Sequence, residues 1–204
     1  MKAAQIIRYS KDIQITVNDI PVPEIGDDDI LIRVKAAAVN PVDILNLTGA
    51  VRLIQDYKMP LTLGNECAGV VEKVGKCVTR FQPGDRVYSR LPISSLGAFA
   101  EYAAIPENAA ARMPEGLDFV TAAAIPLTGL TAYQALTEEL CAKPGQTLFI
   151  PGGSGSFGQR MRFFPPARIG ISCIQRKTIG RPCPASIILS TLWGILSLTV
   201  SCPC

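Results

Sequence analysis

The chain has 204 residues, of which 48% are hydrophobic and 18% are charged, a composition that excludes a wholly disordered protein. Its formal net charge of +3 is unevenly distributed, because residues 1–159 carry all 17 acidic residues and a net charge of −3. Residues 160–204 hold six basic residues and no acidic one. Most of these basic residues stand singly among apolar ones, so the pattern does not predict a nucleic-acid partner.

The two ends of the chain carry no pattern of export or of membrane insertion. Residues 1–9 lack the apolar core of a secretory leader, so we expect a cytoplasmic protein. The apolar run at 186–200 contains Ser, Thr and Gly and is shorter than the ~20 residues that span a bilayer, so we expect no membrane partner. The seven cysteines are irregularly spaced, and a disulfide framework is not predicted.

The first part of the chain has the periodicity of strands. Apolar and polar residues alternate over 13–17 and 30–36, which predicts two strands. Pro21, Pro23 and the acidic run at 26–29 predict a loop between them.

Further strands follow a short helical stretch. Residues 41–45 begin with a proline and predict one or two helical turns. Strands are predicted at 67–74, 86–88 and 100–105, with the Pro-Gly-Asp of 83–85 as a turn. The first ~110 residues therefore predict a compact, mostly antiparallel β domain.

Helical periodicity appears after this domain. Residues 119–124 and 127–140 carry apolar residues at helical spacing, and 147–150 predict a short strand. That strand leads directly into the glycine-rich run of residues 151–158. A strand that enters such a turn is typical of the first unit of a nucleotide-binding fold.

Three glycines in this run match the dinucleotide fingerprint G-x-G-x-x-G. Gly153, Gly155 and Gly158 would let backbone N–H groups and a helix N-terminus approach a pyrophosphate. The motif alone fits a flexible Gly/Ser loop equally well. The strand before it favours the nucleotide-binding interpretation.

Several stretches of the chain together resemble one enzyme family. Residues 64–75, Gly-Asn-Glu-Cys-Ala-Gly-Val-Val-Glu-Lys-Val-Gly, and the Gly-Asp-Arg-Val of 84–87 closely resemble the signature of medium-chain dehydrogenases/reductases. The stretches 37–43 and 126–133 and the glycine run lie in that family's order and spacing. The resemblance covers residues 1 to about 159, and its motifs are jointly specific.

The resemblance implies a mixed fold, α+β followed by α/β. Residues 1–115 would form a GroES-like, mostly antiparallel β domain. Residues 116–159 would form a linking helix and the first βα turn of a Rossmann (doubly wound) domain, which is incomplete. Residues 160–204 have no counterpart in the family, and we expect them to be disordered or loosely collapsed.

The resemblance is to the zinc-free quinone oxidoreductase branch of this superfamily. Zinc-dependent members carry Cys and His where this chain has Asn40 and Asn65, and the chain contains no histidine. Carboxamides are poor zinc ligands, so no metal is expected. The branch uses NADP(H) to transfer hydride to a quinone or an α,β-unsaturated carbonyl, and its full-length members are homodimers.

The resemblance also implies roles for individual residues. Asn40 and Asp43 would line the catalytic cleft, although Asn40 can equally cap a helix and Asp43 can serve its first turn. Glu66 is expected to satisfy buried backbone groups rather than act as a base. The residues expected to bind the cofactor are Thr128, Gly152, Gly153, Ser154, Gly155, Ser156, Phe157 and Gly158.

The family pattern ends shortly after the glycine run. Pro165 and Pro166 oppose the long helix that the family has there, and no residue for reading the ribose can be assigned. With one choice of codons, 166–171 and 185–194 both give family-like runs in the same shifted frame. We therefore hypothesise an internal deletion and a frameshift after residue 159.

Two interpretations of function follow. The first is an NAD(P)H-dependent quinone or enone reductase, with NADPH or NADH and the acceptor left open. The second is a catalytically inactive truncated product in which only the β domain folds. For this chain we expect neither NADPH binding nor quinone turnover, because half of a nucleotide-binding unit leaves adenine and ribose without a pocket.

Overall fold

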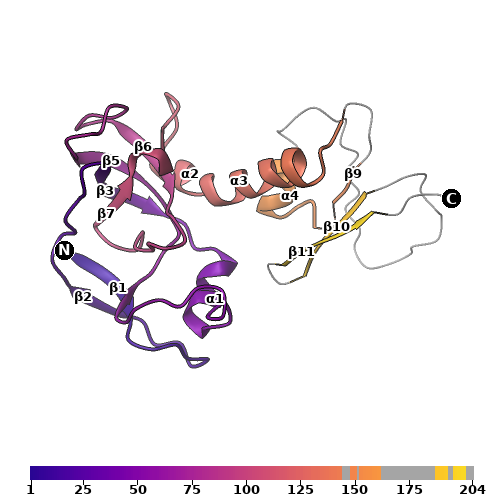
Figure 1. Ribbon diagram of the computed structural model, residues 1–204, viewed down its shortest axis with the longest axis horizontal. Coiled ribbons are helices and arrows are strands. Elements are labelled where there is room, and N and C mark those ends of the chain that lie inside the picture. Colours follow the sequence, from indigo (N-terminus) through magenta and orange to yellow (C-terminus); the bar gives the residue numbers. More distant parts are fainter. Residues whose placement is uncertain (144–147, 151, 162–186, 193–194, 201–204) are drawn as a thin grey trace. The chain divides into compact units, whose positions relative to one another are not determined.

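The computed structural model describes residues 1–143, 148–150, 152–161, 187–192 and 195–200 (Figure 1). The chain divides into two units, Met1–Leu127 and Thr128–Cys204. The domain boundary that the sequence suggested after residue 115 rests on the family resemblance, and it stays a prediction.

Unit 1 is built around a five-stranded antiparallel sheet with the order β7-β3-β5-β6-β8. The central strands β3 and β5 pair over most of their length, with two irregularities in register. A 3₁₀ turn at Glu107–Ala109 precedes the last strand. The strands are β3 Asp29–Ala37, β5 Glu66–Val74, β6 Arg86–Arg90, β7 Tyr102–Pro106 and β8 Ala110–Arg112.

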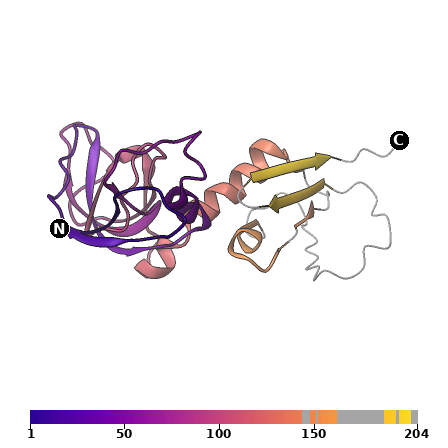
Figure 2. The same ribbon diagram turned by 90° about the horizontal axis from the view of Figure 1, so that it is seen from below.

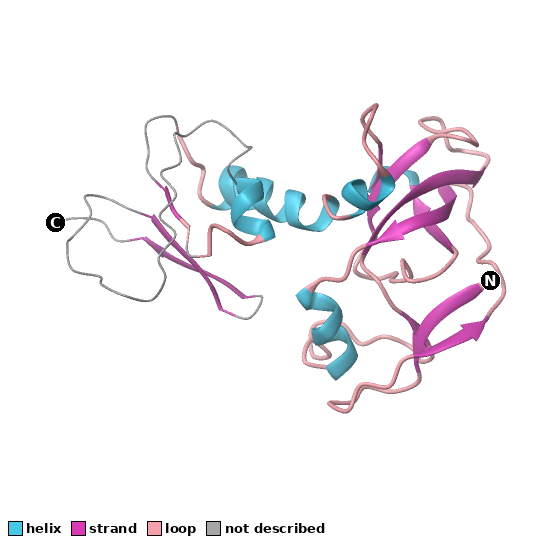
Figure 3. Cartoon of the chain, turned by 180° about the vertical axis from the view of Figure 1, so that it is seen from behind, coloured by secondary structure: helices cyan, strands magenta, loops and turns pink. Residues whose placement is uncertain are grey.

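One face of this sheet forms the main core of unit 1. Ile30 and Ile32 of β3 are fully buried, and they pack with Val71 of β5 and Val87 of β6. Helix α2 (Phe119–Ala123) packs against the sheet, and its buried Ala122 and Ala123 share a cluster with Ala68 of β5. Figure 3 shows the helices of the chain in cyan and its strands in magenta. The alternation predicted for 30–36 and 67–74 therefore corresponds to real strands.

A smaller sheet and one helix complete unit 1. The sheet has the order β2-β1-β4, with β1 at Lys2–Ile6, β2 at Thr16–Asp19 and β4 at Leu61–Thr62. Helix α1 spans Pro41–Thr48 and ends at Gly49, whose φ of 73° is left-handed. The buried residues that α1 shares with this sheet and the segment after it are Ile6, Leu47, Leu61 and Leu63.

Two glycines of the signature stretch are required by close packing. Gly64 has a φ of +99°, and a Cβ there would lie 2.6 Å from the Phe99 backbone nitrogen. A Cβ on Gly69 of β5 would overlap the carbonyl oxygen of Arg33 on β3. Only glycine fits these two positions without displacing the backbone.

The described part of unit 2 begins within a helix and continues into a strand and the glycine turn. Helix α3 spans Pro126–Gln134 and continues as a π-helical segment at Ala135–Glu139. Strand β9 spans Leu148–Phe149, and helix α4 spans Ser156–Met161. The buried residues that these elements share are Ala132, Ala135, Leu136, Leu140, Ala142, Leu148, Ile150 and Met161.

Two strands are described in the segment that the family pattern does not cover. Strand β10 (Ile187–Leu192) is parallel to β9, and β11 (Ile195–Val200) is antiparallel to β10, as Figure 2 shows for the last two. These two segments of the tail are extended, and the expectation that residues 160–204 as a whole are disordered or loosely collapsed stays a prediction. Residues 162–186 lie outside the described residues, and the frameshift hypothesis stays a prediction.

Three details differ from the sequence-based expectations. The strand expected at 13–17 begins at Thr16, and Ile13 and Ile15 are exposed. The helix expected over 127–140 changes to π-helical geometry at Ala135. A helix does follow the glycine run, because α4 ends at Met161, before the prolines can remove its hydrogen bonds.

Within the described part of the chain, no helix is long and apolar enough to cross a bilayer.

Candidate functional site

The first turn of α1 carries the two residues that the sequence assigned to catalysis. Asn40 is the N-cap, Pro41 supplies the first helical position, and Asp43 is the third helical residue. The Asp43 carboxylate accepts a hydrogen bond of 2.7 Å from the Asn40 backbone N–H. The Asp43 backbone N–H in turn donates to the Asn40 carbonyl oxygen at 2.9 Å, and the two bonds fix the start of the helix.

Both side chains also form hydrogen bonds with residues at the beginning of β5. The Asn40 Nδ2 donates to Glu66 Oε1 at 2.6 Å, and the Asn65 Nδ2 donates to Asp43 Oδ1 at 2.6 Å. Glu66 Oε2 accepts from the backbone N–H of Leu127 at 2.7 Å. We call Asn40, Asp43, Asn65 and Glu66 the polar network.

All four residues of the polar network are buried, and none is more than 6% exposed. Burial is the main cause that raises the pKa of Asp43, and the hydrogen bonds from Asn40 and Asn65 act in the opposite direction. Each carboxylate faces N–H donors, which lower the cost of keeping it away from water. The network is therefore a rigid set of oriented hydrogen-bonding groups.

The side chains of the polar network are a poor set of metal ligands. Both carboxamide nitrogens are turned toward carboxylates and donate to them. Within the described residues, no group of three or more His, Cys, Asp or Glu side chains could hold a metal ion. Cys67 is adjacent on β5, but burial and the charge of Glu66 raise its pKa to about 12, which opposes the thiolate form that binds metals.

The glycine turn of unit 2 has a defined backbone. Gly152 has a φ of +74°, and the Gly155 N–H donates to the Gly152 carbonyl oxygen at 2.9 Å. A Cβ on Gly158 would lie 2.5 Å from the Gly153 Cα, so the start of α4 and the turn approach each other closely. This is the strand, turn and helix order that a pyrophosphate site requires.

The remaining residues assigned to the cofactor have different environments. Ser154 and Ser156 are exposed in the turn and at the start of α4. The Phe157 side chain packs against the core of unit 2, so a contact from this residue would come from its backbone. Thr128 is half-buried on α3.

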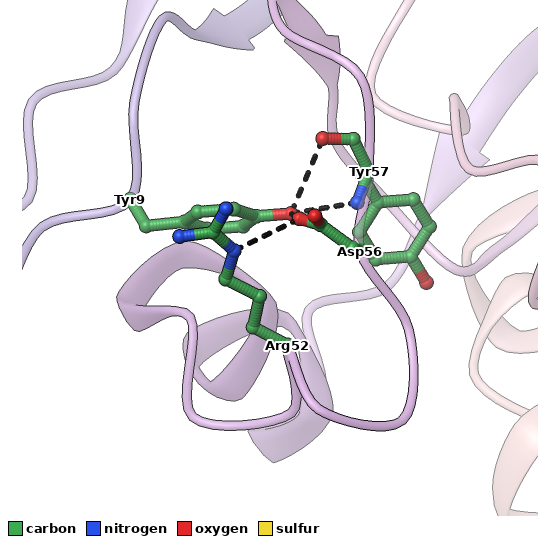
Figure 4. Close-up of polar contacts among 4 residues, drawn as sticks. All are labelled: Tyr9, Arg52, Asp56 and Tyr57. Carbon is green, nitrogen blue, oxygen red and sulfur yellow. Dashed lines mark hydrogen bonds and ion pairs between the residues drawn. The ribbon is translucent and has the colours of Figure 1, made fainter.

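A second polar cluster joins two loops of unit 1, and Figure 4 shows it. The Tyr9 hydroxyl accepts from the Tyr57 backbone N–H at 2.7 Å and lies 3.2 Å from Asp56 Oδ1. Arg52 pairs with Asp56 at 3.1 Å, and its guanidinium lies 5.5 Å from the centre of the Tyr9 ring. We call these four residues the tyrosine clamp; nothing in their sequence spacing predicted it.

Comparison with known proteins identifies the β domain. Residues 26–115 match the alcohol dehydrogenase GroES-like domain. The chain is 36% identical over 159 residues to human quinone oxidoreductase, covering 78% of this chain and 47% of that protein. It is 37% identical over 154 residues to the chloroplastic NADPH-dependent alkenal/one oxidoreductase of Arabidopsis thaliana, covering 72% and 39%.

A solved structure agrees with these relatives. The quinone oxidoreductase of Pseudomonas syringae superposes with a TM-score of 0.71 at 31% identity, covering 78% of this chain and 48% of that one. Residues 26–115 belong to the alcohol dehydrogenase GroES-like domain family, and the chain is similar to quinone oxidoreductases. The predicted fold class, a GroES-like β domain followed by the start of a Rossmann domain, is confirmed. The chain spans about half the length of the curated relatives it matches.

The structure brings together some of the residues that the sequence predicted for the site. Asn40 and Asp43 share one network with Asn65 and Glu66. The interpretation of Glu66 as a partner of buried backbone groups agrees with its bond to Leu127. The catalytic and cofactor-binding roles of the predicted residues stay predictions.

Proposed function

We propose that residues 1–159 are the acceptor-binding domain and the first cofactor-binding turn of an NADP(H)-dependent, zinc-independent reductase of quinones or enones. The names of the relatives support this reaction class. The observation that carries the proposal is the polar network, which offers oriented amides and carboxylates in place of soft metal ligands. Such groups suit hydride transfer, in which the protein orients the reactants.

Zinc does not fit this donor set. Asn40 and Asn65 stand where zinc-dependent relatives have Cys and His, and both use their amide nitrogens as hydrogen-bond donors. Zinc prefers thiolate and imidazole ligands with an open fourth position. We therefore assign no step of the reaction to a metal.

A dinucleotide fits the glycine turn. The left-handed φ of Gly152 disfavours any residue with a Cβ, and the close approach of Gly158 to Gly153 leaves no room for one at 158. This glycine-dependent turn supports a role for the backbone N–H groups of 153–157 in holding a pyrophosphate. Thr128 is proposed to contact the nicotinamide side. When bound, NADPH supplies the hydride.

The polar network is proposed to position the acceptor. Its hydrogen bonds prevent Asn40 and Asp43 from changing rotamer, so the first turn of α1 presents a fixed surface to the substrate. Asp43 would hold a proton more readily than an exposed aspartate, because burial raises its pKa. We further propose that the complete protein is a cytoplasmic homodimer, as the resemblance implies.

A chimera tests this proposal. Residues 1–150 would be joined to the cofactor half of a complete quinone oxidoreductase. The chimera is expected to oxidise NADPH with a quinone in the presence of excess chelator, and the Asn40→Ala variant is expected to lose turnover. An activity that requires added zinc, or that oxidises alcohols only, would contradict the proposal.

The alternative from the sequence, a catalytically inactive product, is kept for the 204-residue chain itself. Fluorescence titration with NADPH and NADH, followed by addition of a quinone, distinguishes the two. Micromolar binding with turnover by this chain would reject the alternative.

A further inference from the structure

Two neighbouring aliphatic residues project from the loop that follows α1. Leu53 is fully exposed and Ile54 is 86% exposed. They occupy the outer part of the loop whose ends are Gly49 and Tyr57. An adjacent pair of exposed large aliphatic residues is a candidate contact surface, because water solvates such side chains poorly.

The tyrosine clamp holds this loop in one conformation. The Tyr9 hydroxyl donates to Asp56 and accepts from the Tyr57 backbone N–H, and Arg52, which lies over the Tyr9 ring, also pairs with Asp56 (Figure 4). The Tyr57 hydroxyl also donates to the Ile93 carbonyl oxygen at 2.9 Å. The loop that carries the two aliphatic side chains is therefore held in place before binding. Less conformational entropy of the loop is then lost when these side chains contact a partner.

The chain segments that the tyrosine clamp joins are positively charged overall. The two segments that the clamp joins, 8–12 and 51–58, carry four basic and two acidic residues, a net charge of +2. All six side chains belong to exposed residues. The basic residues are Arg8, Lys11, Arg52 and Lys58, and the acidic ones are Asp12 and Asp56.

We propose that the Leu53–Ile54 tip inserts into the interfacial region of an anionic phospholipid bilayer, with Arg8, Lys11 and Lys58 facing the headgroups. Apolar side chains flanked by cations are the combination that binds negatively charged membranes at their surface. The net positive charge opposes a symmetric contact with a second copy of the chain. Peripheral binding of this kind requires no spanning helix, and it does not depend on the proposed reductase function.

Vesicle sedimentation with the full 204-residue chain tests the proposal. Binding to vesicles of phosphatidylcholine with phosphatidylserine is expected to exceed binding to pure phosphatidylcholine. The double variant Leu53→Ser/Ile54→Ser is expected to weaken binding about tenfold, since two aliphatic side chains no longer leave water. The double variant Lys11→Gln/Lys58→Gln is expected to weaken it by a similar factor of about ten.

Matched variants control for composition and folding. Val120→Ser removes an aliphatic residue that is 74% exposed on α2, and Lys73→Gln removes an exposed charge on β5. Both are expected to bind like the unchanged chain. The Leu53→Ser/Ile54→Ser variant should unfold at the same temperature as the unchanged chain, because neither Leu53 nor Ile54 is buried.

Three outcomes would overturn the proposal. The first is that the unchanged chain fails to sediment with phosphatidylserine vesicles. The second is that the tip variant binds them as well as the control variants do. The third is a dimer, detected by sedimentation velocity without lipid, that the tip substitutions dissociate; this would assign the tip to a second copy.

Discussion

The two units differ in how their glycines are used. In unit 1, Gly69 lies inside a paired strand and allows β5 to approach the Arg33 carbonyl of β3. In unit 2, Gly155 lies in an open turn, and a Cβ there would be 3.3 Å from the Gly152 oxygen. Gly69 is therefore required by strand packing, whereas the surroundings of Gly155 could accept a Cβ after a small adjustment.

The units also differ in their buried polar groups. Unit 1 encloses two carboxylates in the polar network, and both receive hydrogen bonds from well-placed N–H groups. The shared core of the described part of unit 2 consists of Ala, Leu, Ile and Met side chains. Removing one hydrogen-bonding atom from the polar network should therefore leave a buried partner unsatisfied, a loss that the apolar core of unit 2 does not offer.

The largest expected effect is at Gly69. The Gly69→Ala substitution should lower the free energy of unfolding of unit 1 by about 3 kcal/mol, because the new Cβ meets backbone that cannot move aside. Gly155→Ala is the matched substitution in unit 2 and should cost less than about 1 kcal/mol. Urea unfolding followed by circular dichroism measures both, and equal losses would remove the contrast between the units.

The next effect concerns Glu66. Glu66→Gln replaces one of the two accepting carboxylate oxygens by an NH₂ group. Either Asn40 Nδ2 or the Leu127 N–H would then face a donor in place of an acceptor. We expect a loss of about 2 kcal/mol in unfolding free energy. Glu72→Gln on the same strand is the control, because its exposed pair with Arg33 should be worth less than about 1 kcal/mol.

A pH dependence should come from Asp43. Burial raises its folded pKa above the ordinary value of 3.8, so the folded state holds the proton more tightly than the unfolded state. As pH rises from about 3.8 through the folded pKa, the unfolded state ionises first, and the stability contributed by Asp43 falls.

Comparison with a neutral residue isolates this contribution. The difference in unfolding free energy between the unchanged chain and Asp43→Asn should decrease across the same pH range. Denaturant unfolding at closely spaced pH values provides the measurement. A difference that increases with pH would mean that the hydrogen bonds from Asn40 and Asn65 outweigh burial.

The last prediction concerns the alkylation rates of the cysteines of unit 1 and involves no change in stability. Burial, followed by the charge of Glu66, raises the pKa of Cys67 to about 12, whereas Cys77 is exposed. At pH 8, iodoacetamide should alkylate Cys77 about a hundredfold faster than Cys67, because the thiolate is the reactive form. Peptide mapping after brief labelling checks this, and equal rates would show that the β5 core opens readily.

Strong periodicity allowed the main strands to be predicted, and short elements escaped prediction. The alternation at 30–36 and the apolar run at 67–74 correspond to β3 and β5. Strands β4 and β8 have two and three residues, too few to show a period of two. The alternation at 13–17 was misleading, because most of that segment lies outside a sheet and its isoleucines are exposed.

The site could be predicted only as far as its residue types. The resemblance indicated Asn40 and Asp43, but it gave no basis for pairing Asn40 with Glu66 across 26 positions. The tyrosine clamp was invisible in the sequence, because Tyr9 and Tyr57 lie 48 positions apart in loops without a motif. Such contacts depend on tertiary packing, which local pattern does not encode.

The hydrogen bond from Leu127 to Glu66 has a consequence for how the chain folds during synthesis. These residues are 61 positions apart, and the match to the GroES-like family ends at residue 115. A nascent chain that has reached only residue 115 cannot supply this donor to the buried carboxylate. The β domain can therefore satisfy its buried Glu66 only after residue 127 has been made, twelve positions beyond the end of the family match.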